Sequence, residues 1–590
     1  MKSLAATKTI LRRAISSRAD YFPRAFREND PAQLAIISIV AVVALLPIMI
    51  YGIPNGADLA NHLRFALPFH EAIQSGHFHP GWLAESNDGL GDPRFRFYPP
   101  GFYYLLSATL ALTGGWFSAT LAAFIVLSIV GGAGAYFWAR TLGAPKMARW
   151  AGVLYVLAPY RLNELYQASL LSEYAACSIL PFTFAFVERI CRKPRAFDIA
   201  GLGAAYALLI LTNLPLAVIG SISLAVYALL RIERKNFAAT CARLGLAVIV
   251  ALAASSFFWT TVIAELSWIK GSASTPNVYY DYRANFLFSP SALTNRNTWY
   301  ANLLALAAIG FLLPAIVFIF RAFRKKNSIG EFKAALILLL ATFLMATGLS
   351  RPLWAIVPKL SEVQFPWRWL AVTSLMGALL VAASIPQWIE QFRAKVRPRD
   401  LAVAFAFALA CFFTVTQVIY DCDYLGHAKF DSVAHDVRGA VSFKDWLPIA
   451  ARDVVHIEKM NGRVDAGNRA VTIDSWEPER RTFHVAAGPE PSLRVRTYFY
   501  PHWKAVSAGK TLPVSAAPDG TLLISAPAQA ADIELVFQEP PRVHLFELVS
   551  ALTWLLLIAM LGFGLIHGRE RSRELMRSVP GAIATGSAFL

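Results

Sequence analysis

The sequence predicts an α-helical membrane protein that crosses the bilayer about twelve times and carries a small external β-sandwich near its C-terminus. Apolar runs of about 20 residues recur along a chain of 590 residues that is 56% hydrophobic, and soluble domains do not contain repeated runs of that length. Short clusters of Lys and Arg separate these runs, as the positive-inside rule requires of cytoplasmic loops. Residues 421–545 are instead polar and contain no long apolar run, which indicates a folded domain outside the membrane.

The composition also excludes two classes of function. The formal net charge is +17, but the basic residues lie in short clusters between apolar runs, so we expect no nucleic-acid partner. The five Cys residues have neither the spacing of metal ligands nor the pattern of a disulfide framework. Membrane lipids are therefore the expected surroundings of most of the chain.

The N-terminal segment, residues 1–32, contains seven Lys or Arg residues and is predicted to lie in the cytoplasm. No small-residue cleavage site precedes a polar mature region, so the apolar run Gln33–Ile53 is interpreted as a retained membrane anchor. The chain then emerges on the external side in a loop at 54–98. This loop is periplasmic if the protein comes from a Gram-negative bacterium.

The next apolar segment, Pro99–Thr113, has only fifteen residues, which is fewer than a helix needs to cross a bilayer. Basic residues follow the next span, Trp116–Trp138, and belong in the cytoplasm. An additional crossing before that span would place them outside. We therefore expect 99–113 to form a half-buried or re-entrant helix.

The rest of the chain alternates between the two sides of the membrane, with a basic cluster after each inward crossing. The predicted spans are 33–53, 116–138, 148–158 with its flanks, 173–187, 197–211, 214–230, 244–264, 301–320, 334–349, 370–389, 401–420 and 546–566. These spans divide the chain into a transmembrane domain at 33–420, an external domain at 421–545, a last helix at 546–566 and a cytoplasmic tail at 567–590. Loops at 54–98, 265–299 and 350–369 are expected on the external side.

The external domain is expected to be built from strands. Apolar and polar residues alternate, as in half-buried strands, over the segments 469–473, 482–486, 493–498 and 532–537. Pro518-Asp519-Gly520 is typical of a turn between two further strands. We interpret the region as a β-sandwich tethered at both ends by helices.

The loop at 54–98 contains the first candidate site residues. Asp58 lies five residues beyond the first apolar segment, and in a helix over 57–76 it shares one face with His62. Ionisable groups near the membrane are costly and tend to be functional. An apolar stripe beside them is expected to rest on lipid and consists of Leu59, Leu63 and Leu67.

Asp58 has two alternative interpretations. It can be a solvated carboxylate that merely ends a helix, or a structural residue paired with Arg64 or Arg161. Asp88 and Asp92 belong to the same loop, but their sequence context, NDGLGDP, favours turn formation.

Later external segments bring together further ionisable residues, namely Arg161, Glu164, Glu173 and Arg368. Carboxylates beside cations at an apolar surface suit an anionic lipid headgroup, because guanidinium binds phosphate and a carboxylate accepts a proton from a hydroxyl. Arg368 has an alternative role as an interfacial anchor, since it lies between two Trp residues. The chain contains no P-loop, Rossmann glycine motif, HExxH or nucleophile elbow.

Several of these segments resemble known membrane proteins. An external loop that opens with an Asp and ends in Phe97-Tyr98-Pro99-Pro100 resembles the GT-C class of polytopic glycosyltransferases. The segments GADLANHL, FRFYPPGFYYL, PYRLNELY, SEYAA, VQFPWRWL and YFYPHWKAVSAGKTLPV resemble bacterial membrane proteins labelled 6-pyruvoyl-tetrahydropterin synthase-related. Nothing in the chain resembles a soluble pterin enzyme with its His-rich zinc site.

The resemblance implies a GT-C-like fold and roles for individual residues. Asp58 would be the general base, and Glu164 or Glu173 the acid of the second loop. His62, Arg161 and Arg368 are the expected substrate-binding residues. The chain lacks an unambiguous Asp-x-Asp metal motif, so no metal ligand is predicted, and a divalent metal remains an open alternative.

The resulting hypothesis is a glycosyltransferase of the bacterial inner membrane, with both termini in the cytoplasm. It would move a sugar from a polyprenyl-phosphate carrier, its lipid-linked donor, to an external acceptor. The alternatives are a non-catalytic binding protein or transporter of lipid-linked envelope intermediates, and an assembly factor whose β-sandwich binds a partner. No oligomeric state is predicted.

Overall fold

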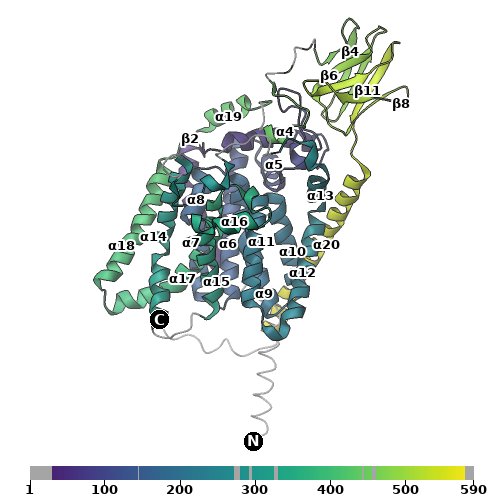
Figure 1. Cartoon of the computed structure of the whole chain (residues 1–590). Coiled ribbons are helices and arrows are strands. Elements are labelled where there is room, and N and C mark those ends of the chain that lie inside the picture. Colours follow the sequence, from purple (N-terminus) through teal and green to yellow (C-terminus); the bar gives the residue numbers. More distant parts are fainter. Residues whose placement is uncertain are drawn as a thin grey trace.

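The computed structural model describes residues 30–143, 145–271, 280–290, 296–324, 330–440, 444–454, 457, 460 and 462–577. Most of the helices stand side by side in one bundle, and a β-sandwich lies beyond one end of it (Figure 1). Residues 1–29 of the predicted cytoplasmic N-terminus and parts of the loop at 265–299 fall outside the described residues. The protein is therefore a multi-helix bundle with a separate β domain, as the sequence predicts.

Eight helices within the described part of the chain are long and apolar enough to cross a membrane. They are α6 (Trp116–Thr141), α9 (Leu171–Arg192), α11 (Leu214–Arg231), α12 (Phe237–Ala254), α14 (Arg296–Arg324), α17 (Leu370–Ala394), α18 (Pro398–Phe413) continued by the π-helical η12 (Thr414–Tyr420), and α20 (Pro541–Arg577).

The four other predicted spans are also helical but are shorter or interrupted. They are α2 (Asp30–Ala44) followed by α3 (Leu46–Tyr51), α7 (Pro145–Val156), α10 (Ala196–Thr212) and α15 (Lys333–Met345). The polytopic helical class is thus confirmed, whereas the count of twelve membrane crossings stays a prediction.

Short helices lie at the end of the bundle that carries the sandwich (Figure 1). They are α4 (Leu59–Gln74), α5 (Gly101–Thr113), α13 (Ser256–Glu265) and α19 (His427–Asp436). Other short elements of the chain are η1 (Arg94–Arg96), α8 (Pro159–Tyr166), α16 (Arg351–Ile356) and η11 (Pro366–Trp369). At the same end, β1 (Ile53–Pro54) pairs antiparallel with β2 (Tyr424–Leu425). This pairing joins the end of the first helix to the start of the last excursion of the chain.

The apolar stripe of α4 corrects one prediction. Leu59, Leu63 and Leu67 are exposed by only 1%, 2% and 3%, and they belong to the main hydrophobic core. The expectation that they rest on lipid is wrong, because protein packs over that face of the helix. Helical periodicity shows which face is apolar but not whether lipid or protein covers it.

Helix α5 accounts for the short apolar segment before α6. Its thirteen residues extend over about 20 Å at 1.5 Å per residue, less than the roughly 30 Å of a hydrocarbon core. Gly114 then adopts the left-handed conformation, with φ of 75°, and α6 begins two residues later at Trp116. The chain turns there at a position where a residue without a Cβ is favoured.

The β domain contains two antiparallel sheets that share one core. One sheet has the order β3 (Val464–Asp465), β6 (Ser492–Tyr498), β10 (Thr521–Ser525) and β9 (Val514–Ala516); the other has the order β4 (Val471–Trp476), β5 (Arg480–Val485), β11 (Ala531–Phe537), β7 (Trp503–Ser507) and β8 (Lys510–Leu512). Val495 and Leu522 of the first sheet pack in one cluster with Phe483 and Leu535 of the second. The predicted β-sandwich and its Pro-Asp-Gly turn are confirmed.

The sandwich is tied to the bundle by a buried cluster of charges around Glu265, the last residue of α13. Arg96 donates to both Glu265 oxygens, at 2.6 and 2.8 Å, and Tyr500 donates to one of them at 2.8 Å. His502 lies 3.0 Å from the other oxygen, and Arg542 also pairs with it. Burial alone would raise the pKa of Glu265, but the hydrogen bonds from His502 and Arg96 outweigh it and lower this pKa.

Candidate functional site

Asp58 lies at the N-terminal end of α4, in a segment held in place through its backbone. The amide of Asp58 donates to the carbonyl of Ala168 at 3.1 Å, and the amide of Gly56 donates to the Ser169 hydroxyl at 3.1 Å. A Cβ on Gly56 would collide with that hydroxyl. The strand-like segment before α4 is therefore fixed against the turn after α8 (Pro159–Tyr166), where only glycine permits so close an approach.

The Asp58 carboxyl is partly buried and has one polar neighbour on its own helix. The side-chain amide nitrogen of Asn61 donates to Oδ1 of Asp58 at 3.1 Å. Burial raises the pKa of Asp58, while Asn61 and the guanidinium of Arg368 lower it and the Glu173 carboxylate raises it; the net change is upward. A carboxylate with a raised pKa accepts a proton more readily than a solvated one.

Arg368 and Glu173 form an ion pair within electrostatic range of Asp58. Nε of Arg368 lies 2.9 Å from Glu173 Oε2, and Nη1 donates to the carbonyl of Val363 at 2.9 Å. Its guanidinium also stands 5.0 Å from the ring centre of Phe365, and the residue is only 9% exposed. The side chain therefore points into the protein, whereas an interfacial anchor would extend towards the headgroups.

The two carboxylates of the second candidate segment occupy different positions. Glu173 accepts a hydrogen bond from the Tyr160 hydroxyl at 2.9 Å. Glu164 is fully buried, and the Cys177 thiol donates to its Oε1 at 3.6 Å. Burial and then the neighbouring Glu173 carboxylate raise the pKa of Glu164 well above its usual value. Of the two, Glu173 is the one that shares the electrostatic surroundings of Asp58.

Arg161 is directed into the helix bundle and does not contact Asp58 or Arg368. Its Nη2 donates to the carbonyl of Leu127 at 2.9 Å and to the Ser178 hydroxyl at 2.7 Å, and its guanidinium lies 4.3 Å from the ring centre of Tyr174. No ion pair joins Asp58 to Arg161 or Arg64 within the described residues, so the structural alternative for Asp58 lacks its expected partners.

His62 connects three elements and uses both ring nitrogens to do so. Nε2 lies 3.2 Å from the amide of Leu171 and can only accept from it, so Nδ1 carries the proton and donates to the Tyr103 hydroxyl, 2.8 Å away. Burial lowers the pKa of His62 to about 3, which keeps the ring neutral. His62 thus holds α4 against α5 and the start of α9, and neither nitrogen is free for a substrate.

Tyr98 is a site residue that the sequence reasoning did not single out. Its hydroxyl lies 3.5 Å from the Ser172 hydroxyl and interacts electrostatically with Asp58 and Arg368. Its partly exposed ring lies edge-on to Trp446, with ring centres 5.9 Å apart. The Phe-Tyr-Pro-Pro segment that contains it was the only signal available in the sequence.

The described residues do not gather into a metal site. No group of three or more His, Cys, Asp or Glu side chains with suitable geometry occurs among them. Asp88 instead pairs with Arg496 of the β domain, and Asp92 pairs with Arg94 at 2.6 Å. Asp58 thus belongs to no such group among the described residues.

Comparisons with known proteins give one family match and several distant structural matches. A family model described as "6-pyruvoyl-tetrahydropterin synthase related domain; membrane protein" matches residues 95–424. No curated protein matches the chain.

Three solved structures illustrate the distant matches. Arabinofuranosyltransferase AftD from Mycobacteria is 17% identical, with a TM-score of 0.41, over 66% of this chain and 27% of its own. ArnT from Cupriavidus metallidurans bound to undecaprenyl phosphate is 16% identical, with a TM-score of 0.40, over 70% of this chain and 75% of its own. The oligosaccharyltransferase of Archaeoglobus fulgidus is 15% identical, with a TM-score of 0.39, over 69% of this chain and 58% of its own. The chain thus spans about a quarter of AftD, and no residue role is taken from these matches.

Proposed function

The chain belongs to the family of membrane proteins described as 6-pyruvoyl-tetrahydropterin synthase related, whose model matches more than half of it, and we propose that it is a GT-C-like glycosyltransferase. In this proposal it moves a sugar from a polyprenyl-phosphate carrier to an acceptor hydroxyl on the external side of the bacterial inner membrane. The observation that supports the proposal best is the grouping of Asp58 with the Arg368–Glu173 ion pair.

The proposed reaction assigns one role to each of these groups. Asp58 accepts the proton of the acceptor hydroxyl as its oxygen attacks the anomeric carbon. The bond between that carbon and the phosphate oxygen breaks, and the phosphate leaves on the carrier lipid. Arg368 binds the phosphate as its negative charge develops, and Glu173 holds the guanidinium in position. Glu164, buried behind Glu173, is a second acid whose role stays a prediction.

His62 and Arg161 are assigned positioning roles in this proposal, because the contacts of both are within the protein. Tyr98, which interacts electrostatically with Asp58, and Trp446, which packs edge-on against Tyr98, both present partly exposed rings. Aromatic faces of this kind suit the apolar faces of a sugar or an isoprenoid chain.

The test replaces Asp58 by Asn, which keeps the shape of the side chain but removes the basic carboxylate. In a deletion strain complemented with Asp58→Asn we expect lipid-linked glycans to accumulate, with turnover reduced roughly 10²- to 10⁴-fold, the usual contribution of a general base. The purified variant should keep the melting temperature and the carrier-lipid binding of the unmodified protein. Asp88→Asn, in the same loop but paired with the β domain, is the matched control.

The same experiment separates the proposal from its main alternative. A binding protein or transporter of lipid-linked intermediates would keep its function with Asn at position 58, because binding does not need proton transfer. Full complementation by a well-folded Asp58→Asn variant would therefore remove Asp58 from the mechanism and exclude the enzyme hypothesis in this form.

A further inference from the structure

The spanning helix that precedes the β domain, α18, ends in the π-helical segment η12 (Thr414–Tyr420). The amide of Asp421 donates at 3.0 Å to the carbonyl of Thr416, five residues earlier, whereas in an α-helix it would bond to the residue four earlier. Carbonyls at the C-terminal end of a helix need donors from outside the helix. π-helical turns are frequent at functional sites, and the partners of this one lead to Asp58.

Two side chains from distant segments supply the donors for this helix end. Gln167, which follows α8 directly, donates from Nε2 to the carbonyls of Gln417 and Val418, at 3.2 and 3.1 Å. The hydroxyl of Tyr424, on β2, donates to the carbonyl of Ile419 at 2.6 Å. Val418 is fully buried in the main core. The end of η12 is therefore a fixed point to which both segments are attached.

The turn that carries Gln167 contacts the segment that leads into α4. The amide of Ala57 donates to the carbonyl of Gln167 at 3.2 Å, and the amide of Asp58 donates to the carbonyl of Ala168 at 3.1 Å. The amide before these two donates to the hydroxyl of Ser169 at 3.1 Å. Ser169 is buried and has a left-handed φ of 48°, which a residue with a Cβ keeps only where surrounding contacts impose it. Three consecutive residues of the turn thus hold three consecutive amides.

The other side of the same segment is attached to β2. β1 (Ile53–Pro54) pairs with β2 (Tyr424–Leu425), and the amide of Asn55 donates to the carbonyl of Asp423 at 2.8 Å. The end of η12, the turn at Gln167, the segment 53–58 and β2 therefore form a closed ring of hydrogen bonds. Because Asp58 belongs to this ring, the position of its backbone depends on both attachments to η12.

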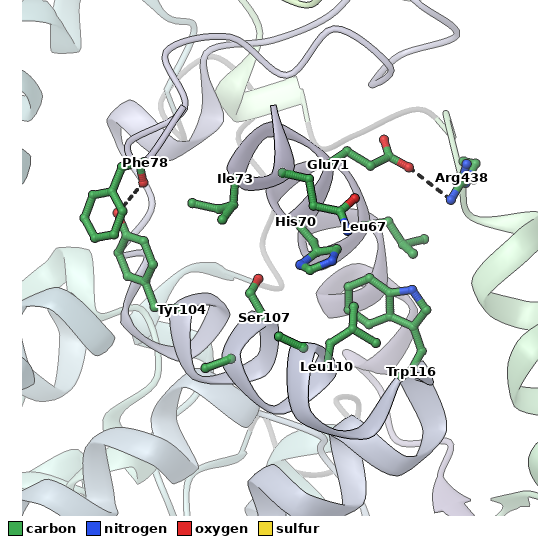
Figure 2. Close-up of a pocket in the computed structure, with 14 residues that line it drawn as sticks. Leu67, His70, Glu71, Ile73, Phe78, Tyr104, Ser107, Leu110, Trp116 and Arg438 are labelled. Atoms are coloured by element: carbon green, nitrogen blue, oxygen red, sulfur yellow. Dashed lines mark hydrogen bonds and ion pairs between the residues drawn. The ribbon is translucent and has the colours of Figure 1, made fainter. Parts of the chain in front are cut away.

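The opposite end of α4 has a contact of its own. Glu71 follows Asp58 by thirteen residues, which is about 20 Å along a helix. Its Oε1 lies 3.0 Å from Nη2 of Arg438, and the pair stands beside α4 in Figure 2. A change in the ring therefore acts on the start of α4 and leaves the contact at its far end in place.

We propose that Gln167 is a positioning residue for Asp58, and that the π-helical end of α18 presents two carbonyls to its side chain. In an α-helical end the amide of Asp421 would bond to the carbonyl of Gln417 and compete with Gln167. The effect on sugar transfer rests on the function proposed above, in which Asp58 is the general base, whereas the attachment itself does not. Misplacing a catalytic group by about 1 Å can reduce the rate roughly 10²-fold.

The first experiment measures hydrogen exchange at the amides of Ala57 and Asp58 by mass spectrometry of the purified full-length protein in detergent. Gln167→Met keeps the length of the side chain but removes its donor. Exchange at these amides should become roughly five- to tenfold faster, which corresponds to the loss of one net hydrogen bond. Gln167→Lys keeps a donor that suits the carbonyls at a helix C-terminus and should restore the original rate. Tyr424→Phe, which removes the other attachment to η12, should also speed exchange.

The second experiment separates positioning from a merely structural role. Purified Gln167→Met should bind polyprenyl phosphate as tightly as the unmodified protein does, whereas a deletion strain complemented with this variant should accumulate lipid-linked glycans. Gln167→Lys should restore function in that strain. Glu71→Gln is the matched control, because it removes the ion pair at the other end of α4. It should change neither function nor the exchange of residues 57 and 58.

Three results would overturn the proposal. They are unchanged exchange at residues 57 and 58 in both Gln167→Met and Tyr424→Phe, exchange as fast in Gln167→Lys as in Gln167→Met, and normal function of Gln167→Met in a strain where Asp58→Asn is inactive. Faster exchange in Gln167→Met together with full function of Asp58→Asn would refute the proposed mechanism of sugar transfer while supporting the attachment.

Discussion

Replacing Arg368 by Lys keeps the positive charge but removes the planar guanidinium that holds two partners at once. In the structure, Nε lies 2.9 Å from Glu173 and Nη1 donates to the carbonyl of Val363 at 2.9 Å. A single ammonium group on a flexible chain cannot reach both partners in this geometry. Loss of one hydrogen bond that involves a charged group costs about 1.5–3 kcal/mol, so we expect Arg368→Lys to lower the free energy of unfolding by about that amount.

Removal of the positive charge of Arg368 should lower the free energy of unfolding further than Arg368→Lys does. In Arg368→Met the buried Glu173 carboxylate loses its cation, and breaking a buried pair from one side typically costs 3–5 kcal/mol. Glu173→Gln in the same background should recover part of this loss, because it removes the unpaired charge. Arg368→Met, Glu173→Gln alone, the double variant and the unmodified protein form a double-mutant cycle.

Thermal unfolding of the purified protein in detergent measures these differences, and accumulation of lipid-linked glycans in the deletion strain measures function. Arg283→Lys is the control, because Arg283 is an Arg of a predicted external loop with 65% of its side chain exposed. We expect Arg368→Lys to impair both readouts and the control to change neither. Normal stability and normal function of Arg368→Lys would show that Arg368 is an interfacial anchor, since Lys also extends to the headgroups.

Three further predictions follow from other parts of the structure. The pKa of His62 is lowered from 6.5 to about 3 in the folded protein, so its contribution to stability is complete above pH 6.5 and is lost as the pH falls towards 3. The free energy of unfolding should therefore be roughly 2–3 kcal/mol lower at pH 4.5 than at neutral pH. The variant His62→Gln should flatten this pH dependence. Glu265→Gln should loosen the β domain from the bundle and speed limited proteolysis between them, and an unchanged cleavage rate would contradict the role of the charge cluster. In a Cys-free background, an impermeant thiol reagent should label Cys at position 88 or 510 in intact cells but not at position 235, and labelling at 235 would reverse the proposed orientation.

Local sequence patterns predicted those features whose cause is also local. The alternation of apolar runs and basic clusters identified the helices, and the alternation of single apolar residues identified strands such as β6 and β11. Asp58 was placed correctly at the start of a helix because the apolar periodicity begins immediately after it. The stripe on α4 was assigned to lipid because periodicity contains no information about what covers a face.

Features that depend on contacts between distant segments could not be predicted from local sequence patterns. The ion pair of Arg368 with Glu173 joins positions far apart in the sequence, and nothing near either residue specifies the other. Glu164 and Glu173 look equivalent in sequence, and the fold buries both, but only Glu173 lies beside Arg368. The role of Glu265 was missed for the same reason, since its partners come from the first loop, the β domain and the start of α20.

The charge cluster at Glu265 also suggests why a β domain is attached to this bundle. Arg96 is fully buried, and such a charge is tolerated only when it is paired and hydrogen-bonded. Its partners are Glu265 of the bundle and Glu539 at the end of the sandwich. Tyr98, two residues further on, interacts with Asp58 and Arg368. The β domain therefore helps to fix the loop that carries Tyr98, and release of the domain should displace this ring from the proposed site before it unfolds any spanning helix.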